Sequence, residues 1–275
     1  MLNFTVNQAT CIKCGTCVTE CPARIISMEG GQRPAISPEN EANCYQCQHC
    51  LSICPAASIS ILGRDPKNSL PLTGNLPDAA QMELLIKGRR AVRQYKPENI
   101  EPEILQQLLA VACYAPTGRN TRQVRFTVVN DREKLIEIRN EIMEKLVEIA
   151  NGEGFPAGME FFSTYVRQWE EDRTDFIFRG APHFIVVSAP REIPTPVEDC
   201  LIALTTFELY AQILGIGTVW DGLAKYVIND LLPEFKTRLG IPEDHLFGYA
   251  MAFGKPAVQY ARTTQLEPAG IHLVT

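Results

Sequence analysis

The chain has 275 residues, of which 45% are hydrophobic and 21% charged, a composition typical of a globular protein large enough for two domains. A net charge of -6 argues against nucleic acid as the main partner, because phosphate binding needs a basic face. The sequence lacks the run of about 18 apolar residues that a membrane span requires, and its N-terminus does not resemble a signal peptide. We therefore expect a cytoplasmic protein that binds no membrane.

The first predicted domain, residues 1–61, holds eight of the ten cysteines. They form two copies of the pattern C-x2-C-x2-C-x3-C-P. The first copy is Cys11, Cys14, Cys17, Cys21 and Pro22; the second is Cys44, Cys47, Cys50, Cys54 and Pro55. Without a secretion signal, clustered cysteines favour metal ligands over disulfides, and thiolates are the soft ligands that iron–sulfur clusters require.

This segment resembles bacterial-type ferredoxins with two [4Fe–4S] clusters. In such proteins the fourth cysteine of each run ligates the other cluster. The resemblance implies that the ligands of one cluster are Cys11, Cys14, Cys17 and Cys54, and those of the other Cys44, Cys47, Cys50 and Cys21. A pair of zinc sites is the alternative, but it leaves the third cysteine of each run and the C-P ending unexplained.

The rest of the chain divides into a linker at residues 62–78, which collects Pro, Gly and Asn, and a second domain at 79–275. Apolar spacing predicts helices at about 102–115, 131–149 and 196–214. Their expected starts are Pro102 in a first turn, Asn130 as an N-cap with Glu133 as its partner, and a capping box at 195–198. Short apolar runs predict strands at 124–129, 184–188, 218–220 and 246–253.

The predicted helices are longer than the predicted strands, and no regular β-α-β rhythm appears, so we predict an α+β fold for the second domain. Cys113 and Cys200 fall on predicted helices and are expected to be buried, inert thiols. The segment 155–178 is rich in aromatic residues. It can be read as core or, in part, as a substrate lid that includes Tyr165 and Trp169.

Four short motifs carry the chemistry of the second domain. The first is the basic run Lys87-Gly88-Arg89-Arg90-Ala91-Val92-Arg93, whose guanidinium groups suit phosphate oxygens, although such a run alone is usually a solvated face. The others are Ala-Pro-Thr-Gly-Arg-Asn at 115–120, Leu-Gly-Ile-Gly-Thr-Val-Trp-Asp-Gly at 214–222 and Gly-Lys-Pro at 254–256. In this order, over about residues 80–262, they resemble the nitroreductase family of flavoproteins.

The resemblance implies an α+β sandwich that forms a homodimer with flavin mononucleotide (FMN) at the interface. The residues expected around the FMN phosphate are Arg89, Arg90, Ala91, Arg93 and Arg262. Those expected to line the flavin from the partner subunit are Pro116, Thr117, Gly118 and Asn120. Those expected to place a backbone N–H near flavin N5 are Asp221, Gly222 and Leu223. The sequence departs from the family pattern at Ala91, where serine is usual, and at 122–123, where Arg-Gln replaces Gln-Pro.

These features favour an FMN-dependent oxidoreductase whose two [4Fe–4S] clusters relay electrons to FMN for reduction of a nitroaromatic, quinone or enone-like acceptor. The electron donor would be a ferredoxin or NAD(P)H. We predict no catalytic side chain, because the chemistry belongs to the cofactor. Alternatives are a reductive dehalogenase or dehydrogenase on the same fold, and a non-enzymatic electron carrier or redox sensor.

Overall fold

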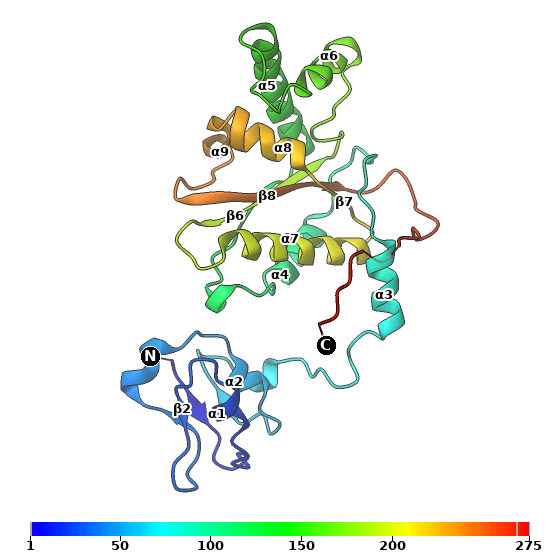
Figure 1. Ribbon diagram of the computed structural model, residues 1–275. Helices are drawn as coiled ribbons and strands as arrows, with labels where there is room; N and C mark the ends of the chain where they lie inside the picture. The colour runs from blue at the N-terminus through cyan, green and yellow to red at the C-terminus, as the bar shows by residue number, and fades with distance from the viewer. Residues whose placement is uncertain (1, 268, 275) are drawn as a thin grey trace. The chain divides into compact units, whose positions relative to one another are not determined.

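The computed structural model describes residues 2–267 and 269–274 (Figure 1). The chain divides into two compact units, Met1–Pro77 with Arg119–Thr121, and Asp78–Gly118 with Arg122–Thr275. The first unit carries both cysteine runs, and the second carries the largest sheet. Within the described ranges, no helix is long and apolar enough to cross a membrane.

The first unit is built from very short elements. Two antiparallel pairs of two-residue strands are β1 (Thr5–Val6) with β4 (Ile59–Ser60), and β2 (Ile26–Ser27) with β3 (Ala35–Ile36). The helical segments are α1 (Thr16–Glu20), η1 (Pro38–Asn43), α2 (His49–Ser52) and η2 (Pro66–Asn68). Its small core consists of Leu2, Cys17, Ile25, Ile26, Cys50, Leu51, Ile59 and Ile61. A core of this size gives little stability by itself, so such units usually depend on disulfides or bound metal.

The second unit is organised by a four-stranded sheet of order β5-β6-β8-β7, in which every pair is antiparallel. Its strands are β5 (Arg125–Val129), β6 (His183–Pro190), β7 (Gly217–Trp220) and β8 (His245–Gly254). Strand β6 is buried on both faces: Phe184 and Val186 enter one core, whereas Ile185 and Val187 enter the other. This alternation follows from the two-residue period of a strand.

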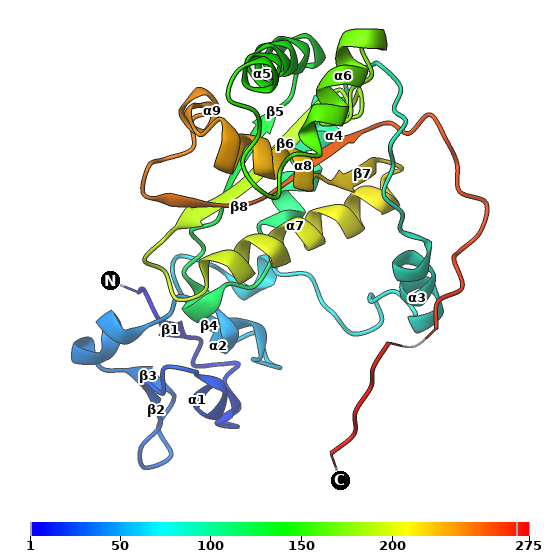
Figure 2. The ribbon, with the colours of Figure 1, turned by 45° about the horizontal axis from the view of Figure 1, so that its top comes forward.

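Helices cover both faces of this sheet (Figure 2). One face packs against α4 (Pro102–Ala112) and α7 (Pro196–Ile213). The other packs against α5 (Arg132–Asn151), α6 (Phe162–Asp172), α8 (Gly222–Tyr226) and α9 (Glu234–Arg238). The remaining segments are α3 (Ala79–Gly88), η3 (Gly118–Asn120) and η4 (Val227–Leu231). The predicted α+β sandwich is therefore confirmed.

Two predicted helix starts are wrong in detail. The N-cap of α5 is Asp131, whose Oδ1 accepts a hydrogen bond from the Lys134 N–H at 2.9 Å, and not Asn130. Thr195 is the N-cap of α7, but its hydroxyl donates to Asp199 at 2.8 Å, so the predicted capping box does not form. The Thr195 hydroxyl oxygen accepts no hydrogen bond from a backbone N–H of the first turn.

The two cysteines outside the N-terminal runs differ from each other. Cys200 is fully buried on α7, as predicted, and burial raises the pKa of its thiol to about 12. Cys113 is exposed, so the prediction of a buried thiol is wrong there. It is the C-cap of α4 and directly follows Ala112, which is buried in the core.

Candidate functional site

The eight N-terminal cysteines gather in two sets of four within the first unit. Burial raises the pKa of the Cys17 thiol, and the nearby thiols that add to this shift are Cys54, Cys14 and Cys11. Burial also raises the pKa of Cys50 to about 11, and the nearby thiols that add to this shift are Cys47, Cys44 and Cys21. The fourth cysteine of each run therefore lies near the other run.

The surroundings of these thiols suit a soft, partly buried cofactor. One cavity is lined by all four members of the second set, and its apolar wall consists of Ala23, Ile25, Ile26, Ile36 and Ile61. Backbone N–H groups of Gln46 and Ser58 donate to the sulfurs of Cys44 and Cys54, at 3.3 and 3.2 Å. Such N–H···S bonds stabilise thiolate ligands and tune cluster potentials.

A single metal ion would need a different arrangement, with its ligands converging on one point. The described part of the chain contains no group of three or more His, Cys, Asp or Glu side chains that could hold one ion. The thiolates of a four-iron cube instead occupy its separate corners.

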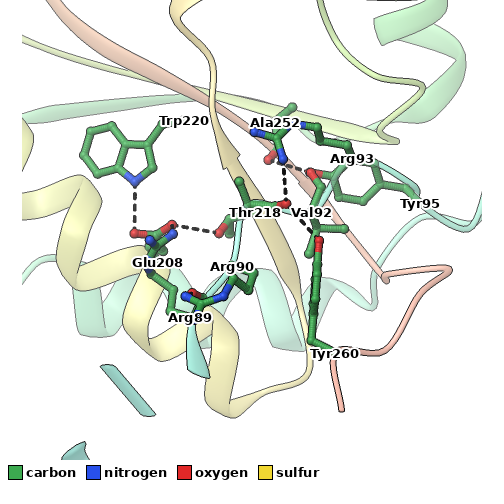
Figure 3. Close-up of polar contacts among 11 residues, drawn as sticks. Arg89, Arg90, Val92, Arg93, Tyr95, Glu208, Thr218, Trp220, Ala252 and Tyr260 are labelled. Atoms are coloured by element: carbon green, nitrogen blue, oxygen red, sulfur yellow. Dashed lines mark hydrogen bonds and ion pairs between the residues drawn. The ribbon is translucent and has the colours of Figure 1, made fainter. Parts of the chain in front are cut away.

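In the second unit, the basic run follows α3 and pairs with β7 (Figure 3). Arg89 Nη1 lies 3.0 Å from Oε1 of Glu208, a buried carboxylate on α7. Arg90 folds back on the backbone, donating to the carbonyl oxygens of Lys87 and Arg89. Arg93 donates to the carbonyl of Ala91 at 3.3 Å. The three arginines therefore lie in one region, but Arg89 is already paired.

The C-terminal segment passes beside this basic run. Thr264 accepts a hydrogen bond from Arg90 at 2.5 Å, and the Tyr260 hydroxyl donates to the Ala91 carbonyl at 3.2 Å. Arg262 is exposed and lines an open groove together with Gly88 and Val92. Arg262 and part of the basic run therefore line the same groove.

The loop that contains Pro116 and Thr117 is held at the start of α7. Asp199 accepts hydrogen bonds from the Gly118 N–H at 2.9 Å and from the Thr195 hydroxyl at 2.8 Å. A Cβ atom on Gly118 would lie 2.0 Å from the Thr195 hydroxyl oxygen, so only glycine fits. Asp199 and Glu208 are nine positions apart on α7, about 13.5 Å along the helix axis, so one helix contacts both the loop and the basic run.

The residues after this loop adopt unusual backbone angles. Arg119, Asn120 and Arg122 have φ values of 53°, 56° and 51°, in the left-handed region that non-glycine residues rarely occupy. Such strain concentrates at functional sites, where the surrounding structure holds it. Arg122 is also one of the two positions, with Gln123, where the sequence departs from the family pattern.

The turn after β7 is fixed by a buried side chain. Asp221 caps α8 by accepting a hydrogen bond from the Ala224 N–H at 2.8 Å, and burial raises the pKa of its carboxyl group to about 8. A Cβ atom on Gly222 would approach the Tyr249 hydroxyl to 3.2 Å. Leu223 packs against the core below. The backbone N–H groups of this turn are therefore held in a defined position.

The aromatic segment forms core more than surface. Phe162 and Trp169 are buried, and the guanidinium carbons of Arg139 and Arg173 lie 5.1 and 5.2 Å from the Trp169 ring centroid. Trp169 is therefore a core residue, and the lid interpretation does not apply to it. Phe161, which is 41% exposed, has the accessibility that a lid residue needs.

Glu208 is the site residue that sequence reasoning missed. It is the one acidic residue in the apolar run from Cys200 to Leu214. A charged side chain in the middle of an apolar helix is seldom buried without partners. That contrast is the signal that could have identified it.

A helix-covered antiparallel sheet that follows two ferredoxin-type cysteine runs defines a two-part redox protein. The sequence model of the Nitroreductase family matches residues 86–255, so the chain belongs to the nitroreductase family. A second sequence model, described as a 4Fe-4S dicluster domain, matches residues 10–59. Both resemblances noted in the sequence are thereby confirmed.

Three similar proteins illustrate this membership. Nitroreductase NfnB of Mycolicibacterium smegmatis is 27% identical over 209 residues, covering 65% of this chain and 87% of the relative. A nitroreductase with bound FMN from Desulfitobacterium hafniense is 28% identical, with a TM-score of 0.56 over 73% of this chain and 100% of that one. A nitroreductase with bound FMN from Bacteroides fragilis is 24% identical, with a TM-score of 0.58 over 72% of this chain and 100% of that one. The last likeness concerns the fold alone.

Proposed function

We propose that this chain is an FMN-dependent oxidoreductase in which two [4Fe–4S] clusters relay electrons to FMN, which reduces a small organic acceptor by two electrons. The observation that carries the proposal is the arrangement of eight cysteines in two sets of four, in one chain with a nitroreductase-family domain. The expected acceptors are nitroaromatic, quinone or enone-like compounds. The donor is a ferredoxin or NAD(P)H.

The cluster ligands in this proposal follow the two spatial sets. Cys11, Cys14, Cys17 and Cys54 hold one cluster; Cys44, Cys47, Cys50 and Cys21 hold the other. Ligation by the fourth cysteine of the opposite run ties the two halves of the small unit together. Residues 62–78 then serve as a linker between the cluster domain and the FMN domain.

The residues present also fit FMN. Arg89, Arg90 and Arg93, with the backbone of Ala91 and the late Arg262, form a donor set suited to a phosphate dianion. The fixed turn at Asp221, Gly222 and Leu223 offers backbone N–H groups to the flavin ring. FMN, when bound, takes up electrons singly and delivers them in pairs.

A homodimer completes the proposed site. Three apolar residues of α7, Val197, Ile202 and Ile213, are 45%, 40% and 62% exposed. Met82, Leu84 and Ile86 on α3 are exposed as well. Apolar side chains that gather on a surface mark interaction sites. We expect a second copy to cover them, with Pro116, Thr117, Gly118 and Asn120 lining the partner's flavin.

The first test is chemical. The purified protein should contain about eight irons from two four-iron clusters, and one FMN per chain. The flavin absorbance is then followed anaerobically with reduced ferredoxin and with NAD(P)H in parallel. A double variant, Cys11→Ser with Cys44→Ser, should keep FMN but lose reduction by ferredoxin.

Cys113→Ser is the matched control, because Cys113 lies outside both sets and is exposed. It should behave as the parent protein. Rapid reduction of the double variant by NAD(P)H would show that electrons can enter without the clusters, and the proposed relay would then be wrong.

A further inference from the structure

Glu208 lies in the interior of the second unit, with only 4% of its surface exposed, and it accepts hydrogen bonds from three side chains (Figure 3). Oε1 receives Arg89 Nη1 at 3.0 Å and the Thr218 hydroxyl at 3.3 Å. Oε2 receives the indole Nε1 of Trp220 at 2.9 Å. A buried carboxylate needs such donors, because an unpaired charge in the interior is strongly unfavourable.

These three donors come from the two halves of the proposed FMN site. Arg89 lies in the basic run, whereas Thr218 and Trp220 lie on β7, which leads directly into the turn at Gly222. The halves are also joined through the backbone, since the Val92 N–H donates to the Thr218 carbonyl at 2.8 Å. A Cβ atom on Gly217 would lie 2.7 Å from Val92, so these two segments pack in close contact.

We infer that Glu208 is a positioning residue that holds Arg89 and the β7 turn at a fixed spacing, so that one FMN can engage both its phosphate site and its ring site. The inference rests on the proposed function, because it assigns a role within the FMN site. Glu208 does not itself need to touch FMN.

The negative charge of Glu208 indicates that its role is to orient Arg89, because it cannot attract the FMN phosphate. A carboxylate beside a phosphate site repels the phosphate, so a site built only for attraction would exclude it. The guanidinium group has five N–H donors on a rigid plane, and Glu208 uses one of them. With 34% of the Arg89 side chain exposed, the rest of the plane can serve a ligand. Holding Arg89 in one rotamer removes the entropy loss that binding would otherwise include.

The sign of the effect of Glu208→Gln separates these two roles. If Glu208 orients Arg89, removing its charge frees the arginine, and the dissociation constant for FMN rises by about tenfold, the equivalent of one charge-assisted hydrogen bond. If Glu208 acts only through repulsion, the same substitution makes FMN bind more tightly. FMN affinity is measured on the full chain with its clusters, by quenching of flavin fluorescence.

Three further measurements make the test specific. In an Arg89→Gln background, Glu208→Gln should change FMN affinity by less than it does alone, because its target is gone. The flavin midpoint potential of the FMN-saturated Glu208→Gln protein should shift, because the single amide oxygen of glutamine cannot hold both Arg89 and Trp220 as the two carboxylate oxygens do. Glu141→Gln, which removes an exposed ion pair with Arg238, is the control and should change neither quantity.

The outcomes are distinguishable. If the parent protein binds no FMN, the proposed function and this inference both fail. If the parent binds FMN and folded Glu208→Gln binds it equally or more tightly, only the inference is overturned. A circular dichroism spectrum and a melting curve establish whether the variant is folded, and Glu208→Asp, which keeps the charge but shortens the reach, should also weaken FMN binding.

Discussion

The two units differ in how much apolar core their residues form. In the first unit, the buried apolar cluster has eight members among the described residues, and two of these are cysteines of the metal-binding pattern. In the second unit, the clusters on the two faces of the sheet have 24 and 14 members. We therefore expect the first unit to depend for its fold on what its cysteines bind, and the second to have enough core to fold without its cofactor.

This difference predicts that the two units respond separately when the clusters are lost. The loss of structure in the first unit should be the largest effect among these predictions. Replacing Cys50 by serine removes a buried member of the second set, and we expect the whole first unit to lose its structure. Hydrogen exchange should show protection lost across residues 2–61 and retained in β6 and β8. Iron content should fall at the same time.

Two control variants test whether the two units respond independently. Cys113→Ser should leave iron content and exchange unchanged. Phe207→Ala removes a fully buried ring from the second unit and should cost about 3–5 kcal/mol there, without loss of iron. If Cys50→Ser retains full protection in the first unit, that unit is stabilised by its own core and the comparison is wrong.

The same difference explains what could be predicted from the sequence. In the first unit, the cysteine spacing is a local pattern, so eight candidate ligands could be named directly from it. In the second unit, the strands and long helices were predictable because their apolar periods reflect burial. The contacts within its candidate site were not predictable. Glu208 and Arg89 are separated by 119 positions, and no local sequence pattern indicates that they pair. The hydrogen bonds from the Gly118 N–H and the Thr195 hydroxyl to Asp199 were not predictable for the same reason.

A second prediction concerns the pH dependence of the stability of the second unit, which tests whether its buried core stabilises it. His183 is buried, and its Nε2 accepts a hydrogen bond from the Ile100 N–H at 2.8 Å. Burial lowers the pKa of this imidazole to about 4. In the unfolded chain it would protonate near pH 6.5, the usual value for histidine.

Between pH 6.5 and 4 the unfolded state therefore binds more protons than the folded state, and stability falls as pH falls. The loss attributable to His183 should reach about 3 kcal/mol at pH 4. Denaturant melts of the second unit at several pH values measure it. His183→Gln should remove this part of the slope, because glutamine does not titrate, and its side-chain oxygen can still accept from the Ile100 N–H. His272→Gln, on the exposed tail, should leave the slope intact.

The smallest effect comes from the start of α5, where sequence and structure disagree by one residue. Asp131 accepts the Lys134 N–H at 2.9 Å, and its second oxygen accepts from Asn99 at 3.2 Å. Asp131→Ala should lower the melting temperature of the second unit by about 2–4 °C, the usual consequence of a lost N-cap in a domain of this size. Asn130→Ala should leave it unchanged, because no cap hydrogen bond depends on that side chain. Equal shifts in the two variants would show that the boundary of α5 is not fixed by the Asp131 cap, and that helix packing alone determines where this helix begins.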